Sequence, residues 1–268
     1  PFARTDDYPA LFGEWRQYWW KTLSEGRWLN HLWMARPAFF DRHALFWLFA
    51  GLWCAAWALT AVAAFRDDRG PWRALPAAAA LALMPQGALF AAWPYTTIPA
   101  AALLAGYAAV VALAPRRAAV GALLVFVPLG WLAYTTLPLL MLGVLALGAD
   151  WRDARPRAVL RALALFCAAF AAGYLIVQAL NWAIHGHFGI VIPRWREAGP
   201  ADSLPALLAN LADFAAWLAD TLHAMAGESA LLALVLAWLV ARRARRAAAG
   251  GSTALLALAG TAVVALAV

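Results

Sequence analysis

The sequence predicts an all-α membrane protein: a polytopic transmembrane helical bundle of about eight spans with two extracytoplasmic interfacial amphipathic helices. Three observations predict it. Of the 268 residues, 65% are hydrophobic and 13% are charged, whereas about 25% of an ordinary soluble domain is charged. Apolar runs recur along the chain at lengths that suit a bilayer. The 16 Trp residues suit membrane interfaces, where indole combines an apolar ring with a hydrated N–H.

Polar connections divide these runs into spans. Six spans occupy residues 43–180, and two more occupy residues 223–268, the last of them incomplete. The run that begins at Leu137 is short for a hydrocarbon core about 30 Å thick. We expect spans at His43 to Phe65, Ala74 to Ala92, Ile98 to Ala114, Ala118 to Tyr134, Leu137 to Gly148, Ala158 to Leu180, His223 to Ala241, and Thr253 onward.

Cationic residues predict the orientation of the bundle, because Lys and Arg are retained on the cytoplasmic side during insertion. The connections at 93–97 and 135–136 hold no cation, and residues 181–222 hold two. Residues 181–222 (the second segment) are therefore expected to be extracytoplasmic. By parity we expect the same of residues 1–42 (the first segment), although these hold six cations. The other connections share 13 arginines: Arg66, Arg69, Arg73, Arg116, Arg117, Arg152, Arg155, Arg157, Arg161, Arg242, Arg243, Arg245 and Arg246.

The net charge of +7 does not indicate nucleic-acid binding, because the basic residues lie in short clusters between apolar runs. One Lys against 20 Arg, with abundant Ala, is typical of a GC-rich bacterial genome. We therefore expect a multi-pass protein of the bacterial inner (plasma) membrane. We also expect a further span to precede Asp6.

Each of the two extracytoplasmic segments contains an amphipathic helical pattern. In the first, Leu11, Trp15 and Trp19 recur at helical spacing, and Gly26 is placed to end the helix. In the second, the pattern starts at Ser203. Such helices lie in the headgroup region with their apolar face toward lipid. A membrane-lying connector without chemistry is the simpler interpretation.

Acidic and basic side chains of these segments are the candidates for chemistry. Asp6 and Asp7 can act as a general base, or Asp7 can hold a divalent cation such as Mg or Mn; the alternative is helix capping. Arg27, Arg194 and Arg196 lie where the insertion rule disfavours cations. Guanidinium forks match phosphate oxygens, whereas general attraction to anionic lipid is the competing explanation.

Histidine and aromatic residues complete the candidate set. His185 and His187 flank Gly186, so they could share a metal with a third ligand, or they could line a substrate cleft. The candidate residues for binding the acceptor or the sugar are His31, Trp93, Tyr95, His185 and His187. Motifs for nucleotide hydrolysis, zinc proteases and serine hydrolases are absent from the sequence.

The Asp6-Asp7 pair, the aromatic helix that leads to Gly26-Arg27-Trp28-Leu29, and the Trp93-Pro94-Tyr95 loop together resemble the GT-C class of membrane glycosyltransferases. The similarity is to bacterial enzymes of the O-antigen glucosyltransferase type and covers Asp6 to about Tyr134. It implies an essential acid at Asp6 or Asp7 and a polyprenyl-phosphate sugar donor. It also implies transfer to a glycan or lipid acceptor on the extracytoplasmic face.

These expectations define a lipid-phosphate-dependent hexosyltransferase of cell-envelope polysaccharide biosynthesis, with Arg27, Arg194 and Arg196 on the donor phosphate. Two alternatives remain open. A lipid-linked sugar flippase or other transporter would carry polar residues inside its spans, where Gln86 and Gln178 are the main candidates. A non-catalytic subunit of a polysaccharide assembly complex would not depend on the acidic pair.

Overall fold

Helices make up the regular structure of the described residues. The computed structural model describes residues 15–35, 42–65, 74–82, 93–151 and 154–191, together with parts of 203–216. The eight helices of the described residues are α2 (Trp15–Glu25), α3 (Trp28–Met34), α4 (Arg42–Ala64), α5 (Ala74–Ala82), α7 (Pro94–Leu113), α8 (Arg116–Ala133), α9 (Leu137–Gly148) and α10 (Pro156–His185).

Four of these helices are long and apolar enough to cross a membrane: His43–Ala64, Pro94–Leu113, Arg116–Ala133 and Pro156–His185. Each matches a predicted span to within a few residues at most boundaries. Helix α9 is apolar but has only 12 residues, about 18 Å of helix, which agrees with the short run predicted from Leu137. The predicted spans at His223 to Ala241 and from Thr253 lie outside the described residues.

Helix α10 is the largest departure from the predicted boundaries. It continues five residues beyond Leu180, so Asn181 and His185 belong to the helix rather than to a loop. Gly186 then ends it with φ +68°, in the left-handed region, where glycine has no steric penalty. The sequence did not predict this extension because Asn181 and His185 are polar and the segment was assigned by hydropathy.

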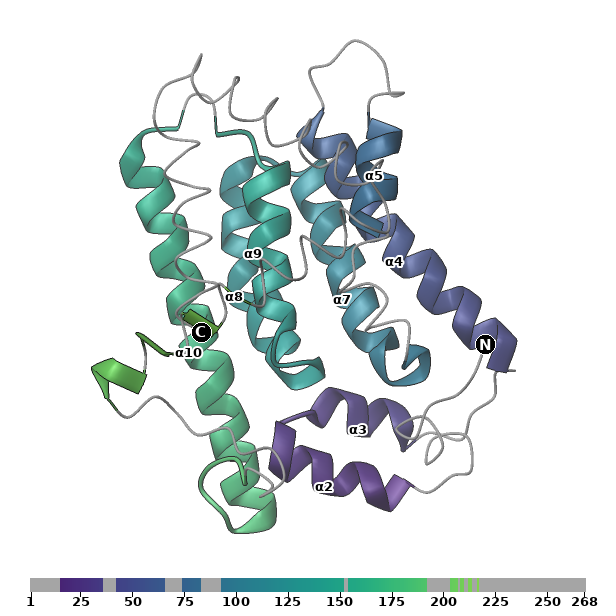
Figure 1. The fold of residues 1–268 in the computed structure, drawn as a ribbon, viewed down its shortest axis with the longest axis vertical. Coiled ribbons are helices and arrows are strands. Elements are labelled where there is room, and N and C mark those ends of the chain that lie inside the picture. Colours follow the sequence, from purple (N-terminus) through teal and green to yellow (C-terminus); the bar gives the residue numbers. More distant parts are fainter. Residues whose placement is uncertain are drawn as a thin grey trace.

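The long helices stand side by side, and α2 and α3 lie crosswise beneath them (Figure 1). Helix α4 packs on α5 and α7, α10 packs on α8, and α9 fills the space between α4, α7 and α8. Large aromatic residues such as Phe49, Trp53 and Tyr107 are buried in the shared core. Burial of such rings by neighbouring helices stabilises this arrangement through close packing.

The bundle has two ends of different chemistry. At the end that carries α3, α7 begins and α8 and α10 end (Figure 1); we call it the α3 end. At the opposite end α8 and α10 begin, and Arg116, Arg117, Arg155, Arg157 and Arg161 lie there; we call it the arginine end. The described members of the cationic set thus lie at one end of the bundle, as their alternation along the chain predicts. Which end faces the cytoplasm stays a prediction.

Candidate functional site at the α3 end

The turn at Gly26 folds the first segment back on itself. Gly26 N–H donates to Thr22 O at 3.0 Å, which is the single hydrogen bond of an αL helix end, and Arg27 N–H donates to Lys21 O at 3.4 Å. The Gly26 φ of +69° lies in the left-handed region that glycine favours. Helix α2 therefore ends where the sequence predicts, and α3 begins two residues later, packed against α2.

Helix α3 is fixed to the bundle on its other side. It contacts α7 and α8, and its Leu29 and Trp33 pack against the main core. Trp33 Nε1 donates to the Tyr95 carbonyl at 3.1 Å, which joins α3 to the first turn of α7. The residues that follow Gly26 are thereby held over the end of the bundle.

A cluster of two tryptophans and two histidines lies at the junction of α2, α3 and α10. The Trp19 ring contacts Trp28, His31 and His185, with centroid distances of 5.9, 5.2 and 4.6 Å. Trp28 and His185 are 5.4 Å apart. Two of the predicted sugar-binding residues, His31 and His185, are thus brought together although they are 154 positions apart along the chain.

Hydrogen bonds join the first segment to the second through this cluster. The Thr22 hydroxyl lies 2.7 Å from His185 Nε2, and Trp28 Nε1 donates to Asn181 Oδ1 at 3.0 Å. Val191 N–H donates to the Leu23 carbonyl at 3.2 Å. The described parts of the two segments therefore meet at the same end of the bundle, whereas the expected convergence of Asp6, Asp7, Arg194 and Arg196 lies outside the described residues.

Asn181 organises the backbone on both sides of this junction. Its Nδ2 donates to the Gly189 carbonyl at 2.8 Å and lies 3.5 Å from the Leu23 carbonyl. The side chain is completely buried, so it holds the chain after α10 against α2 without contact with solvent. A buried amide without a hydrogen-bond partner destabilises the folded state by about 1–3 kcal/mol. Loss of the Asn181 hydrogen bonds should therefore weaken the contact between α2 and the chain after α10.

Arg27 is paired with an acid and an aromatic ring. Its Nε lies 2.5 Å from Glu25 Oε2, and the two side chains are only 13% and 9% exposed. Its Cζ lies 4.2 Å from the centre of the Tyr134 ring, at the end of α8. These contacts fix the direction of the guanidinium. A guanidinium has further N–H groups on its terminal nitrogens.

The electrostatic environment of His31 favours a neutral imidazole. Burial lowers its pKa below the ordinary value of 6.5, and repulsion from His185 lowers the pKa further. A neutral imidazole offers one donor and one acceptor. Near neutral pH the ring can therefore hydrogen-bond to a hydroxyl group without carrying charge.

The remaining predicted residues are placed less centrally. Trp93 precedes α7, and its carbonyl accepts hydrogen bonds from the hydroxyls of Thr96 and Thr97 at 3.0 and 2.7 Å. Tyr95 is buried beneath α3, and His187 is exposed beyond the end of α10. Asp6, Asp7, Arg194 and Arg196 lie outside the described residues.

Several residues of the junction were not predicted as site residues. Trp19 was assigned to an apolar helical face, yet its ring contacts Trp28, His31 and His185. Thr22, on the same helix, is fully buried against protein. Asn181, Tyr134 and Glu25 are held in place by partners far away in the sequence or across a helix end. Two features of the sequence pointed to these residues: the motif Gly26-Arg27-Trp28 and the polar start of the second segment. Neither feature shows which residues elsewhere in the chain would contact it.

Metal binding receives no support from the residues described here. Among them, no three His, Cys, Asp or Glu side chains gather so that they could hold a metal ion. His185 and His187, the pair considered for this role, diverge because the first is turned toward Thr22 and the second is exposed. The cation assigned to Asp7 stays a prediction.

Comparison of the chain with protein-family models, with curated proteins and with solved structures finds no match in any of the three.

Proposed function

We propose that the chain is a membrane glycosyltransferase that moves a sugar from a polyprenyl-phosphate donor to a glycan or lipid acceptor on the extracytoplasmic face. The single observation that carries the proposal is the meeting of the two segments. Thr22 of the first lies 2.7 Å from His185 of the second, and the rings of His31 and His185 both contact Trp19. Two imidazoles thus lie together at the end of the bundle where Arg27 contacts Tyr134, and the apolar helices of that bundle suit a lipid-linked substrate.

The proposed roles follow from the chemistry of these groups. Departure of the lipid phosphate is the step that requires charge stabilisation, and Arg27, with Arg194 or Arg196, supplies it. His31 and His185 bind sugar or acceptor hydroxyls. Asp6 or Asp7 removes the proton from the acceptor hydroxyl or holds a divalent cation. In this account the chain has about eight spans, and α2 and the helix after Ser203 lie at the membrane interface.

Some support for the second of these helices comes from its first turn. Ser203 Oγ accepts a hydrogen bond from Ala206 N–H at 3.3 Å, which is the contact that an N-cap serine makes. Residues 204–206, 208–209 and 212–213 are helical. Leu204 and Leu208 are exposed from the described structure, and an interfacial helix would place such residues in lipid.

The test uses the full chain reconstituted in bacterial lipid with polyprenyl-phosphate glucose labelled in the phosphate. Because the acceptor is unidentified, release of polyprenyl phosphate is measured in the presence of a membrane extract that supplies acceptors. Asp7→Ala or Asp6→Ala should abolish release, whereas Asp213→Ala, an acid on the second segment, should retain it. Full release of polyprenyl phosphate by both the Asp6 and the Asp7 variant would refute the catalytic role assigned to these residues.

Transport of a lipid-linked sugar is the second candidate, and Gln178 favours it. This side chain lies in the α10 candidate span, is 2% exposed, and neither of its polar atoms has a hydrogen-bond partner among the described residues. A buried amide without a partner is unfavourable and can be satisfied by a polar substrate. Uptake by vesicles, lost in Gln178→Leu and retained in the aspartate variants, would favour this candidate.

A further inference from the structure

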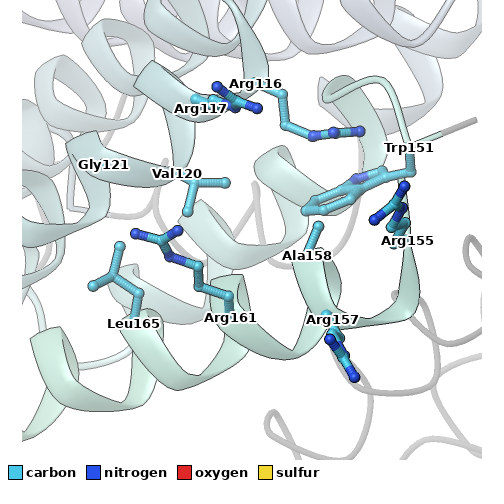
Figure 2. Close-up of a pocket in the computed structure, with 10 residues that line it drawn as sticks. All are labelled: Arg116, Arg117, Val120, Gly121, Trp151, Arg155, Arg157, Ala158, Arg161 and Leu165. Carbon is cyan, nitrogen blue, oxygen red and sulfur yellow. The ribbon is translucent and has the colours of Figure 1, made fainter. Parts of the chain in front are cut away.

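The arginine end of the bundle contains a cavity of about 770 Å³ between the first turns of α8 and α10. Figure 2 shows the ten residues that line it, none of which is acidic. Half of them are arginines: Arg116, Arg117, Arg155, Arg157 and Arg161. The retention of Lys and Arg on the cytoplasmic side requires cations near the ends of the spans but does not require them to line one cavity. The gathering of five arginines around this cavity therefore needs a further explanation.

Two helix N-termini add to the positive potential. Helix α8 begins at Arg116 and α10 at Pro156, and neither has an acidic residue in its first turn or a side-chain cap. Backbone N–H groups at a helix start carry a partial positive charge. Both the backbone and the side chains around this cavity therefore favour an anion.

The wall between the two helices is held in a fixed position. Trp151 is 4% exposed, and its Nε1 donates to the Leu145 carbonyl at 3.3 Å. Arg116 lies over the Trp151 ring at 5.6 Å and donates from Nη1 to the Asp150 carbonyl at 2.7 Å. Arg116 is thus anchored, whereas Arg117, Arg155 and Arg161 are exposed and can turn toward a ligand.

The lining changes from cationic to apolar along both helices. On α8, Val120 and Gly121 lie one turn after Arg116 and Arg117; on α10, Leu165 lies one turn after Arg161. Residues four apart share a helix face. In Figure 2 the Arg161 side chain extends toward Val120, whereas Arg157 points away from the group. A ligand in this cavity would meet cations at one end and apolar surface at the other.

We propose that this cavity binds an anionic phospholipid, with the phosphate on Arg117, Arg155 and Arg161 and the start of an acyl chain against Val120 and Leu165. The binding is separate from the proposed transfer reaction at the α3 end. Arginine pairs with phosphate oxygens through two parallel hydrogen bonds, and the apolar wall distinguishes a lipid from a free phosphate ion. The bound headgroup also offsets repulsion among the arginines.

The test measures phosphatidylglycerol bound to the full chain by native mass spectrometry from detergent micelles. Replacing Arg117, Arg155 and Arg161 with Gln should weaken binding about tenfold, a change of about 1.4 kcal/mol. The matched control replaces Arg242, Arg243 and Arg245 with Gln, which removes the same charge from another cationic cluster of the sequence and should leave affinity within about twofold. Phosphatidylcholine with the same acyl chains should bind more weakly than phosphatidylglycerol.

Three results would overturn the proposal: equal losses in the two triple variants, no loss in the cavity variant, or no preference for phosphatidylglycerol. Inorganic phosphate that displaces the lipid at millimolar concentration would show a site for a free anion instead, and would also overturn it. Should the triple variant fail to fold, Arg161→Gln and Arg157→Gln replace it. The first should weaken binding more than the second, because Arg161 extends toward Val120 in Figure 2 whereas Arg157 points away.

Discussion

Replacement of Gly26 by alanine tests how the first segment is held against the bundle. An added Cβ would lie 2.7 Å from Val177 Cγ1 on α10, and Val177 is fully buried with a stiff β-branched side chain. The φ of +69° adds a backbone penalty of about 1–2 kcal/mol for any L residue. Overpacking adds about 1–3 kcal/mol.

Gly186 supplies the matched control. Its φ is +68°, and an added Cβ would meet nothing within 4 Å. Gly186→Ala should therefore carry the backbone penalty alone. The excess cost of Gly26→Ala over Gly186→Ala measures the close approach of the Gly26 turn to α10.

Thermal unfolding of the full chain in detergent measures both variants. For a chain of this size, each kcal/mol shifts the midpoint by about 2–4 °C. Val177→Ala, which removes both close methyl groups, should reduce the cost of Gly26→Ala in a double-mutant cycle. Equal midpoints for Gly26→Ala and Gly186→Ala, with no coupling to Val177, would refute the packing described for this turn.

Three further predictions concern the junction. Trp28→Phe removes the donor to the buried Asn181 Oδ1 and should cost about 1–3 kcal/mol in thermal unfolding. Trp182→Phe, at an exposed indole on α10, should cost little. The lowered pKa of His31 means that the folded chain binds fewer protons there than the unfolded chain. The stability that neutral His31 contributes is complete above pH 6.5 and is lost as the pH falls toward the lowered pKa. The unfolding midpoint of His31→Asn should therefore fall less on acidification than the midpoint of the native protein. Arg27→Ala should cost about 3–5 kcal/mol because it removes the cation beside the buried Glu25. The double variant Glu25→Gln with Arg27→Met should recover most of that stability. Under the proposed function it should release no polyprenyl phosphate. If transfer is recovered, Arg27 is not part of the donor site.

The helices of the bundle could be predicted from the sequence because bilayer thickness sets the length of an apolar run. Helix α9 has the predicted bounds Leu137–Gly148. The end of α2 could be predicted because Gly26 is a glycine, the residue type that most readily adopts the positive φ of a helix end. Hydropathy failed at the end of α10. Asn181 is polar but helical, because its amide groups are satisfied by Trp28 and Gly189.

The candidate site was predicted only in part, for a physical reason. Local pattern identifies Arg27, His31 and His185 as polar residues in unusual places, but the meeting of His31 with His185 depends on packing between segments more than 140 residues apart. Glu25, the acid next to Arg27, was not predicted as its partner because neighbouring charges on a helix end are common on solvated surfaces. The roles of Asp6, Asp7, Arg194 and Arg196 stay predictions.

The most direct test of the central claim, that the two segments form one extracytoplasmic site, is cross-linking of Leu23→Cys with Val191→Cys after replacement of Cys54 and Cys167. The two backbones are joined by a hydrogen bond of 3.2 Å, which brings the pair within reach of a short bis-maleimide or a disulfide. In intact bacterial cells, a membrane-impermeant cross-linker should join the two cysteines rapidly. Cross-linking only in inverted vesicles, or none in either preparation, would contradict the account.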